Sequence, residues 1–169
     1  MSKLMIFLSV LAFSLWLGAC QPKEVDLLFE TVEQRDASGT GQIYQDTQPG
    51  LIVIATPKET ASLGGLVTSE AQAQLQNLNY NIYFAIAIFQ GRKPTTRYGM
   101  QIEHITRKGN IVTVHALFKE PQPGEPKGDE VTSPYHLVRV QKGGPWKQTI
   151  TFNLIVGNAI VTSLSHYIP

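Results

Sequence analysis

The spacing of apolar and polar residues in this chain is mostly that of β-strands. The clearest case is residues 82–89 (IYFAIAIF), in which isoleucine and phenylalanine alternate with small or aromatic residues. Because successive side chains of a strand point to opposite faces, this run is apolar on both sides. That pattern predicts a central strand whose two faces are both covered. Residues 51–55 (LIVIA) form a second continuous apolar run, typical of a buried strand.

A hairpin is predicted in the middle of the chain. Apolar residues alternate over 98–102, the turn-forming sequence 107–110 (RKGN) follows, and a second strand is expected over 111–118. Ile105 is out of phase with Ile102, which indicates a β-bulge in the first arm.

The remaining pattern predicts a mainly β protein with one short helix. Residues 68–78 (TSEAQAQLQNL) favour the helix, with Thr68 or Ser69 as its cap and Leu75 and Leu78 on one face. Pro134 requires a sheet edge or a bulge. We therefore expect a β-sandwich or a partly open barrel of short antiparallel strands. The other strands are expected at residues 27–34, 131–140, 149–156 and 159–164.

The first nineteen residues have the composition of a secretory signal. Lys3 precedes a fourteen-residue apolar stretch, Leu4 to Leu17, which is shorter than the roughly 20 residues of a membrane-spanning helix. The sequence that closes it, Leu-Gly-Ala-Cys at 17–20, resembles the lipobox of bacterial lipoproteins. The resemblance implies that residues 1–19 are removed and that Cys20 is lipidated, with 20–26 as a tether and 27–169 as a single β-rich domain.

Cys20 is the only cysteine, so it cannot form an internal disulfide. A free thiol or an intermolecular bridge is the alternative to lipidation. The lipobox implies an extracytoplasmic protein that is lipid-anchored to the cell membrane or the outer membrane. Gln21 follows the cysteine. Because an aspartate at that position tends to retain lipoproteins of enteric bacteria in the inner membrane, glutamine is compatible with an outer-membrane location but does not indicate it.

Charge argues against a nucleic-acid partner. The chain has 14 Lys and Arg against 13 Asp and Glu. Loss of Lys3 with the signal makes these numbers equal, whereas nucleic-acid affinity depends on many cationic contacts to phosphate.

The familiar catalytic signatures are absent from the sequence, which contains no G-x-S-x-G, H-E-x-x-H, C-x-x-C or P-loop. If Gly109 and Asn110 form a two-residue turn, His104 lies opposite His115. Such a pair could supply two zinc ligands, but no third ligand is evident, so a solvent-facing pair is the favoured interpretation. His136 and His166 are expected to be ordinary surface or half-buried residues. We predict no enzyme activity, no cofactor and no metal site.

Three blocks of the sequence resemble the C-terminal domain of the protease-complex subunit PrcB family over about residues 84–141. The blocks are an apolar strand with a glycine and a Pro-Thr turn, a Pro-Gly loop, and Ser-Pro-Tyr with an aliphatic strand. Thr96 and Arg97 replace a glycine pair of the family. The matching residues are Gly91, Pro94, Thr95, Tyr98, Pro123, Gly124, Ser133, Pro134, Tyr135, Leu137 and Val138.

The resemblance implies a non-catalytic envelope protein that binds and stabilises an extracytoplasmic partner, since the family is named after a lipoprotein that stabilises a surface serine-protease complex. The same three turns also resemble the loops of chagasin-type protease inhibitors, so inhibition is an alternative function. An envelope protein with a ligand pocket of its own is another. The residues expected to contact a partner are Lys93, Pro94, Thr95, Thr96, Arg97, Pro123, Gly124, Pro134 and Tyr135.

Overall fold

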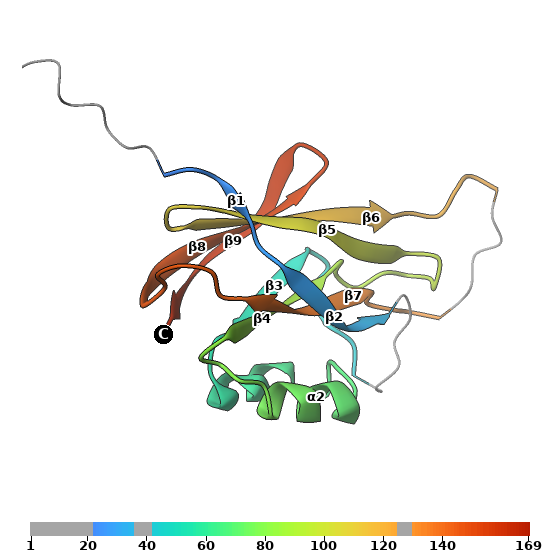
Figure 1. The fold of residues 1–169 in the computed structure, drawn as a ribbon. Coiled ribbons are helices and arrows are strands. Elements are labelled where there is room, and N and C mark those ends of the chain that lie inside the picture. The colour runs from blue at the N-terminus through green and yellow to red at the C-terminus, as the bar shows by residue number, and fades with distance from the viewer. Residues whose placement is uncertain (1–21, 36–41, 125–129) are drawn as a thin grey trace, which may run out of the picture.

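The computed structural model describes residues 22–35, 42–124 and 130–169. Two β-sheets face each other and a helical layer covers the outer side of one of them (Figure 1). The five-stranded sheet has the order β1-β5-β6-β8-β9, and the four-stranded sheet has the order β2-β7-β4-β3. The predicted β-sandwich is confirmed. The strands are β1 (Val25–Asp26), β2 (Phe29–Arg35), β3 (Gly50–Ile54), β4 (Tyr83–Phe89), β5 (Gly99–Lys108), β6 (Ile111–Lys119), β7 (Tyr135–Gln141), β8 (Gln148–Val156) and β9 (Ala159–Ile168).

The strands pair antiparallel with one exception. Strands β6 and β8 run parallel, which places Val112 beside Phe152 and Val114 beside Leu154. The long connection that contains β7 makes this possible, because it leaves the five-stranded sheet and returns to it. The sequence pattern, read strand by strand, predicted antiparallel pairs only.

The main core lies between the two sheets. Phe84 is fully buried there, with its ring 5.0 Å from that of Trp146 and 5.9 Å from that of Phe152. Burial of this apolar surface is the main stabilising contribution to such a fold. The residues of this core with no exposed surface are Ala55, Phe84, Ile86, Ile88, Ile105, Val112, Val114, Val138, Val140, Ile150, Phe152, Leu154 and Ile168.

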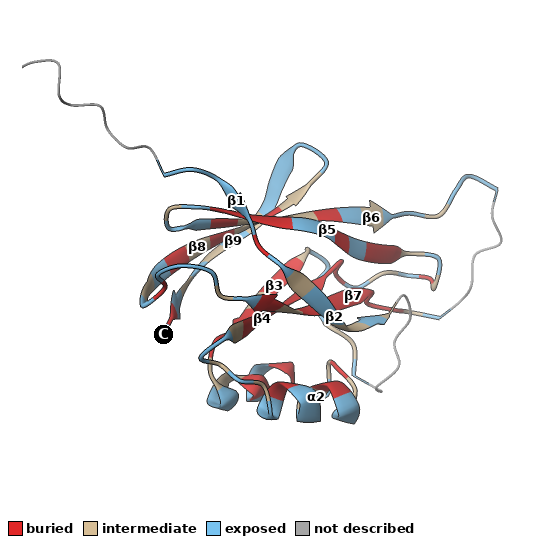
Figure 2. Ribbon diagram, in the orientation of Figure 1, coloured by how far each residue is buried: buried red, intermediate tan, exposed pale blue. Residues whose placement is uncertain are grey.

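The second core explains why β4 is apolar on both faces. Ala85, Ala87 and Phe89 belong to it, together with Leu63, Ala71 and Leu75 of the helical layer. Figure 2 shows the helices buried (red) where they face this sheet and exposed (pale blue) on their far side. The small alanine side chains let the helices approach the sheet closely. This confirms β4 as a central strand, between β7 and β3.

Two helices form the covering layer. The predicted helix is α2 (Ser69–Gln76), and the Thr68 hydroxyl caps it by accepting a hydrogen bond from the Ala71 amide. The pattern missed η1, a 3₁₀-helix at Pro57–Leu63. Its start fits proline, which lacks an amide hydrogen and suits the first turn of a helix.

The β5–β6 hairpin has the predicted register. His104 pairs with His115, and the register shifts between Ile102 and His104, where a bulge was expected. The two imidazole rings stack with centroids 4.0 Å apart on the outer face of the sheet. Burial, and then the neighbouring His104, lower the pKa of His115.

Two expected strands begin elsewhere. Instead of one strand over residues 27–34, β1 pairs with β5 and β2 pairs with β7, so the chain crosses between sheets at the buried Leu27. Part of the expected tether therefore belongs to a sheet. Strand β7 begins only at Tyr135 rather than at residue 131, because Pro134 has no amide hydrogen to donate to a ladder. The expected hairpin around Gly157 is present, and β9 extends to Ile168.

Candidate partner-binding rim

Three connections meet at one end of the sandwich, to the right in Figure 1. They are the β4–β5 connection (90–98), the β2–β3 connection as described from residue 42, and the described parts of the β6–β7 connection (120–124 and 130–134). Lys93 and Thr132 exchange two backbone hydrogen bonds of 2.7 and 2.9 Å. The Arg92 amide donates to the carbonyl of Asp46 at 2.7 Å. We call this end the rim.

The buried residue Gln90 hydrogen-bonds to two other segments at the base of the rim. The backbone amide of Gln90 donates to the Pro134 carbonyl at 2.9 Å, and its side-chain amide donates to the Lys119 carbonyl at 3.2 Å. Gln90 has no exposed surface. These bonds link the ends of β4 and β6 to the start of β7, so the rim connections are held together by hydrogen bonds rather than being three independent loops.

The rim exposes most of the residues expected to contact a partner. Pro94, Arg97, Pro123 and Gly124 are exposed, and Lys93 and Thr96 are partly so. Thr95 is buried, and its hydroxyl accepts a hydrogen bond from the Arg97 amide. The Lys93 ammonium lies 5.3 Å from the Tyr98 ring centroid, a cation–π distance. The sequence prediction omitted Arg92, which is also exposed on the rim.

Pro134 and Tyr135 do not contribute to the exposed surface of the rim, contrary to expectation. Both are buried, and Tyr135 packs 5.6 Å from the Phe89 ring in the second core. The Tyr135 hydroxyl donates to the Glu33 carboxylate at 2.7 Å, and the Thr68 amide donates to the same oxygen at 3.1 Å. A Ser-Pro-Tyr sequence resembles an exposed turn, but here it starts a buried strand.

Glu33 thus joins β2, β7 and the start of α2. Burial opposes its ionisation, but the hydrogen bonds from Tyr135, Thr68 and Arg35 outweigh burial, so the pKa of Glu33 lies below its usual value. Burial, and then the bond to Glu33, raise the pKa of Tyr135. The carboxylate is therefore ionised at neutral pH and positions the helix relative to the sheet.

Tyr135→Phe should lower the free energy of unfolding by about 1 to 2 kcal/mol, because it removes one hydrogen bond to a charged, partly buried carboxylate. Urea unfolding followed by circular dichroism measures this loss. Tyr167→Phe is the matched control, since Tyr167 is 55% exposed and should change stability by less than about 0.5 kcal/mol. Equal losses in the two variants would contradict a structural role for the Tyr135 hydroxyl.

His136 has a role that its sequence did not indicate. It was expected near the surface without partners, but it is 2% exposed and lies between the two sheets. Its Nδ1 accepts a hydrogen bond from the Ile102 amide at 2.9 Å, beside the β5 bulge. The neutral ring therefore carries its proton on Nε2, which is 2.8 Å from the Thr31 hydroxyl. Burial lowers the pKa of His136 to about 4.

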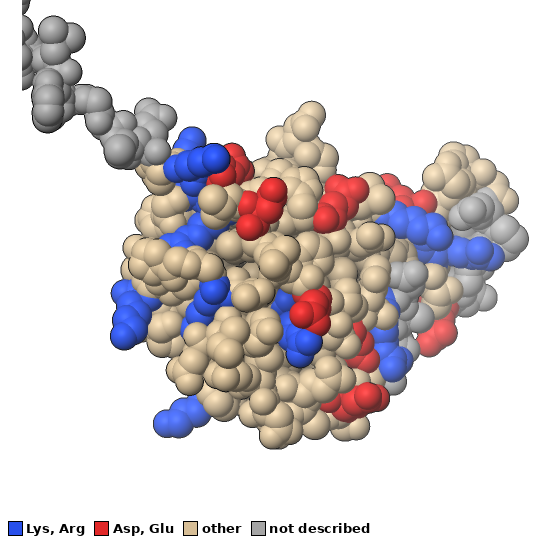
Figure 3. All heavy atoms as spheres, in the orientation of Figure 1, with Lys and Arg blue, Asp and Glu red and all other residues tan. Residues whose placement is uncertain are grey.

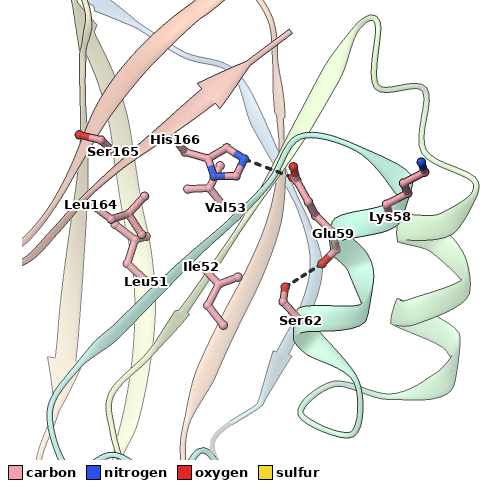
Figure 4. A pocket seen from close by; sticks show the side chains of 9 residues that line it. All are labelled: Leu51, Ile52, Val53, Lys58, Glu59, Ser62, Leu164, Ser165 and His166. Atoms are coloured by element: carbon pink, nitrogen blue, oxygen red, sulfur yellow. Dashed lines mark hydrogen bonds and ion pairs between the residues drawn. The ribbon is translucent and has the colours of Figure 1, made fainter.

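A groove of about 550 Å³ opens between the edge strands β3 and β9, beside η1 (Figure 4). Leu51, Val53 and Leu164 form its apolar side. His166 faces Glu59 across the groove at 3.2 Å, so it has the partner that the sequence did not reveal. The same Glu59 oxygen accepts a hydrogen bond from the Ala55 amide at 2.7 Å. The carboxylate thereby ties the end of β3 to β9.

The groove does not place the Ser62 hydroxyl in hydrogen-bond contact with the His166 imidazole or the Glu59 carboxylate. The Ser62 hydroxyl donates to the Glu59 backbone carbonyl at 2.7 Å rather than to the imidazole (Figure 4). Within residues 22–35, 42–124 and 130–169, no three His, Cys, Asp or Glu side chains are grouped so as to hold a metal ion. In the same ranges, no helix has the length and hydrophobicity to span a bilayer.

The fold is a β-sandwich with a helical covering layer, and backbone hydrogen bonds join three of its connections into the rim. Residues 84–141 match the family model described as PrcB C-terminal, which confirms the resemblance found over that region. The match runs from β4 through β7 and so includes two of the three rim connections. No curated protein and no solved structure matches this chain.

Proposed function

We propose that the protein is a non-catalytic, extracytoplasmic subunit, anchored by a lipid on Cys20, that binds and stabilises a protein partner through the rim. A surface protease complex is the partner class that the PrcB match supports. Cys20 and the preceding signal-like segment lie outside the described residues, so the anchor rests on the lipobox. The observation that carries the proposal is that backbone hydrogen bonds join three connections into one exposed surface.

The chemistry of the rim suits protein recognition. Arg92 and Arg97 are exposed, and arginine forms planar, paired hydrogen bonds with carboxylates. The proline rings of Pro94 and Pro123 and the hydrogen-bonded backbone of Arg92 and Lys93 beside Pro94 limit the conformational entropy that binding would remove. We therefore expect carboxylates on the partner opposite these two arginines. The inhibitor alternative gains no support, since the third turn of its wedge would consist of the buried Pro134 and Tyr135.

Arg92→Glu/Arg97→Glu should abolish partner capture from detergent-solubilised envelopes, since two attractive contacts become repulsive. A loss of more than about tenfold is expected, because like-charge juxtaposition at an interface costs several kcal/mol. The measurement is quantitative pull-down with the tagged mature chain, with captured proteins identified by mass spectrometry.

Lys108→Glu/Lys147→Glu is the matched control, since it makes the same charge change at the opposite end of the sandwich. It should leave capture in detergent unchanged. Capture that survives the rim reversal, or that is lost equally with the control, would contradict the rim as the binding surface. Absence of any stoichiometric partner would overturn the proposed function.

A further inference from the structure

The end of the sandwich opposite the rim is where the described chain begins. Pro22 contacts the β5–β6 turn, with its ring 3.3 Å from the position that a Cβ on Gly109 would occupy. The chain then enters β1, where Val25 pairs with Arg107. The amino-terminal segment is therefore joined to this end of the five-stranded sheet.

Arg107 connects the two turns at this end of the sandwich through hydrogen bonds. It is 7% exposed, and its guanidinium lies 3.9 Å from the Trp146 ring centroid. It donates to the carbonyls of Gly109 and Pro145, both at 2.8 Å, and to that of Gly143 at 3.4 Å. One buried side chain thereby fixes the β5–β6 turn against the β7–β8 turn.

Three exposed lysines flank this cluster, and we call them the basal lysines: Lys23, Lys108 and Lys147. Lys23 follows Pro22, Lys108 precedes Gly109, and Lys147 follows Trp146. None of the three forms an ion pair with another described residue. Figure 3 shows Lys and Arg at this left-hand end, as well as at the right-hand end, with one acidic group beside the uppermost left-hand cations. Most of the other visible acidic side chains lie along the upper face and to the right.

The acids nearest to this end are Glu24, which follows Lys23, and Asp26 of β1. Glu24 is close enough to raise the pKa of His115, which lies on the outer sheet face. Asp26 pairs with Thr106, on the sheet side of Arg107. The turns at the end therefore present mainly positive charge.

We propose that the basal lysines form a docking surface for anionic phospholipid headgroups. The inference rests on the proposed lipid on Cys20. Val25 lies five positions after Cys20, and this stretch spans at most about 18 Å when fully extended. The short tether would hold the basal lysines within reach of the bilayer, where each lysine strengthens attraction to anionic headgroups. The rim then points away from the membrane, toward a partner.

The test uses the chain from Gln21 onward, which contains every described element but no lipid. Flotation with vesicles at low ionic strength compares phosphatidylcholine with phosphatidylcholine and phosphatidylglycerol at three to one. Binding is expected only with phosphatidylglycerol, and added salt should abolish it. Each basal lysine should contribute roughly fivefold in partition coefficient.

Lys23→Glu/Lys108→Glu/Lys147→Glu should reduce binding more than about a hundredfold, since the three fivefold contributions multiply. Arg92→Glu/Arg97→Glu/Lys119→Glu is the matched control at the rim and should bind as the unaltered chain does. Equal loss in both triple variants would indicate nonspecific charge attraction and overturn the proposal, as would absence of binding to phosphatidylglycerol. Lipid labelling of Cys20 and capture of the partner are measured separately, so failure of the anchor or the partner is distinguishable from failure of the docking surface.

Discussion

Replacing His136 with leucine should lower the free energy of unfolding at neutral pH by about 3 kcal/mol. Leucine fills much of the same space but leaves two groups without their partner, the Ile102 amide beside the bulge and the Thr31 hydroxyl. A buried polar group that loses its hydrogen bond costs about 1 to 3 kcal/mol. Urea unfolding measures the loss, and His104→Leu, on the exposed face, should change stability by less than about 1 kcal/mol.

The same histidine should make the fold sensitive to acid. The pKa of His136 is about 4 in the folded state against an ordinary value of 6.5. Between these two values the histidine is protonated in the unfolded chain but neutral in the folded chain. The stabilisation from neutral His136 is complete above about pH 6.5. It declines as the pH falls toward 4, by an amount on the order of 3 kcal/mol.

Unfolding free energies measured between pH 7 and 4 test whether the stability of the fold declines as the pH falls. The unaltered chain should lose stability across that window, and His136→Leu should lose about 3 kcal/mol less. Glu33 contributes only at the acid end of that window and below it, because its stabilisation is complete above its usual pKa of 4.5 and is lost as the pH falls through its lowered folded-state pKa. Parallel pH profiles for the two chains would contradict a neutral, buried His136.

The features predicted correctly are those encoded over short distances. The β5–β6 register follows from a two-residue turn, and the bulge follows from one apolar residue out of phase. The central position of β4 follows from its two apolar faces, although the sequence did not reveal that the second face packs on helices. In each case, neighbouring residues along the chain determine the geometry.

The errors concern partners that are distant in sequence. His136 and Thr31 are 105 residues apart, and Tyr135 and Glu33 are 102 apart. No local pattern distinguishes a histidine that accepts a buried amide from one in solvent. The division of the first expected strand at Leu27 has the same cause, since only the positions of β5 and β7 decide where the chain changes sheets.

The sequence predicted the turn residues of the candidate site but not the contacts between its connections, which again join residues distant in sequence. The turn residues 93–97 and 123–124 are recognisable from proline, glycine and charge, and they are mostly exposed as expected. The sequence did not determine that the first of these turns is hydrogen-bonded to Thr132, or that Ser-Pro-Tyr enters a central strand. Turn chemistry identifies a connection but does not show which connections meet.

Gly91→Ala should destabilise the protein by about 3 kcal/mol or more and loosen the rim. Gly91 has a φ of +91°, a conformation that costs an L-residue roughly 1 to 2 kcal/mol. A Cβ there would lie 2.4 Å from the Thr47 carbonyl oxygen and 2.8 Å from its carbon. Because these are backbone atoms, the β2–β3 connection would have to move, at a further cost of about 1 to 3 kcal/mol.

Gly124→Ala separates the two contributions. Gly124 has a similar φ of +85°, but no atom lies within 4 Å of its added Cβ, so only the conformational cost of about 1 to 2 kcal/mol applies. Urea midpoints at equal m-values compare the variants. Moving the connection should also weaken the bond from the Arg92 amide to the Asp46 carbonyl, so that amide should exchange its hydrogen faster in Gly91→Ala alone. Equal midpoints and equal exchange would show that close packing at Gly91 does not hold the rim together.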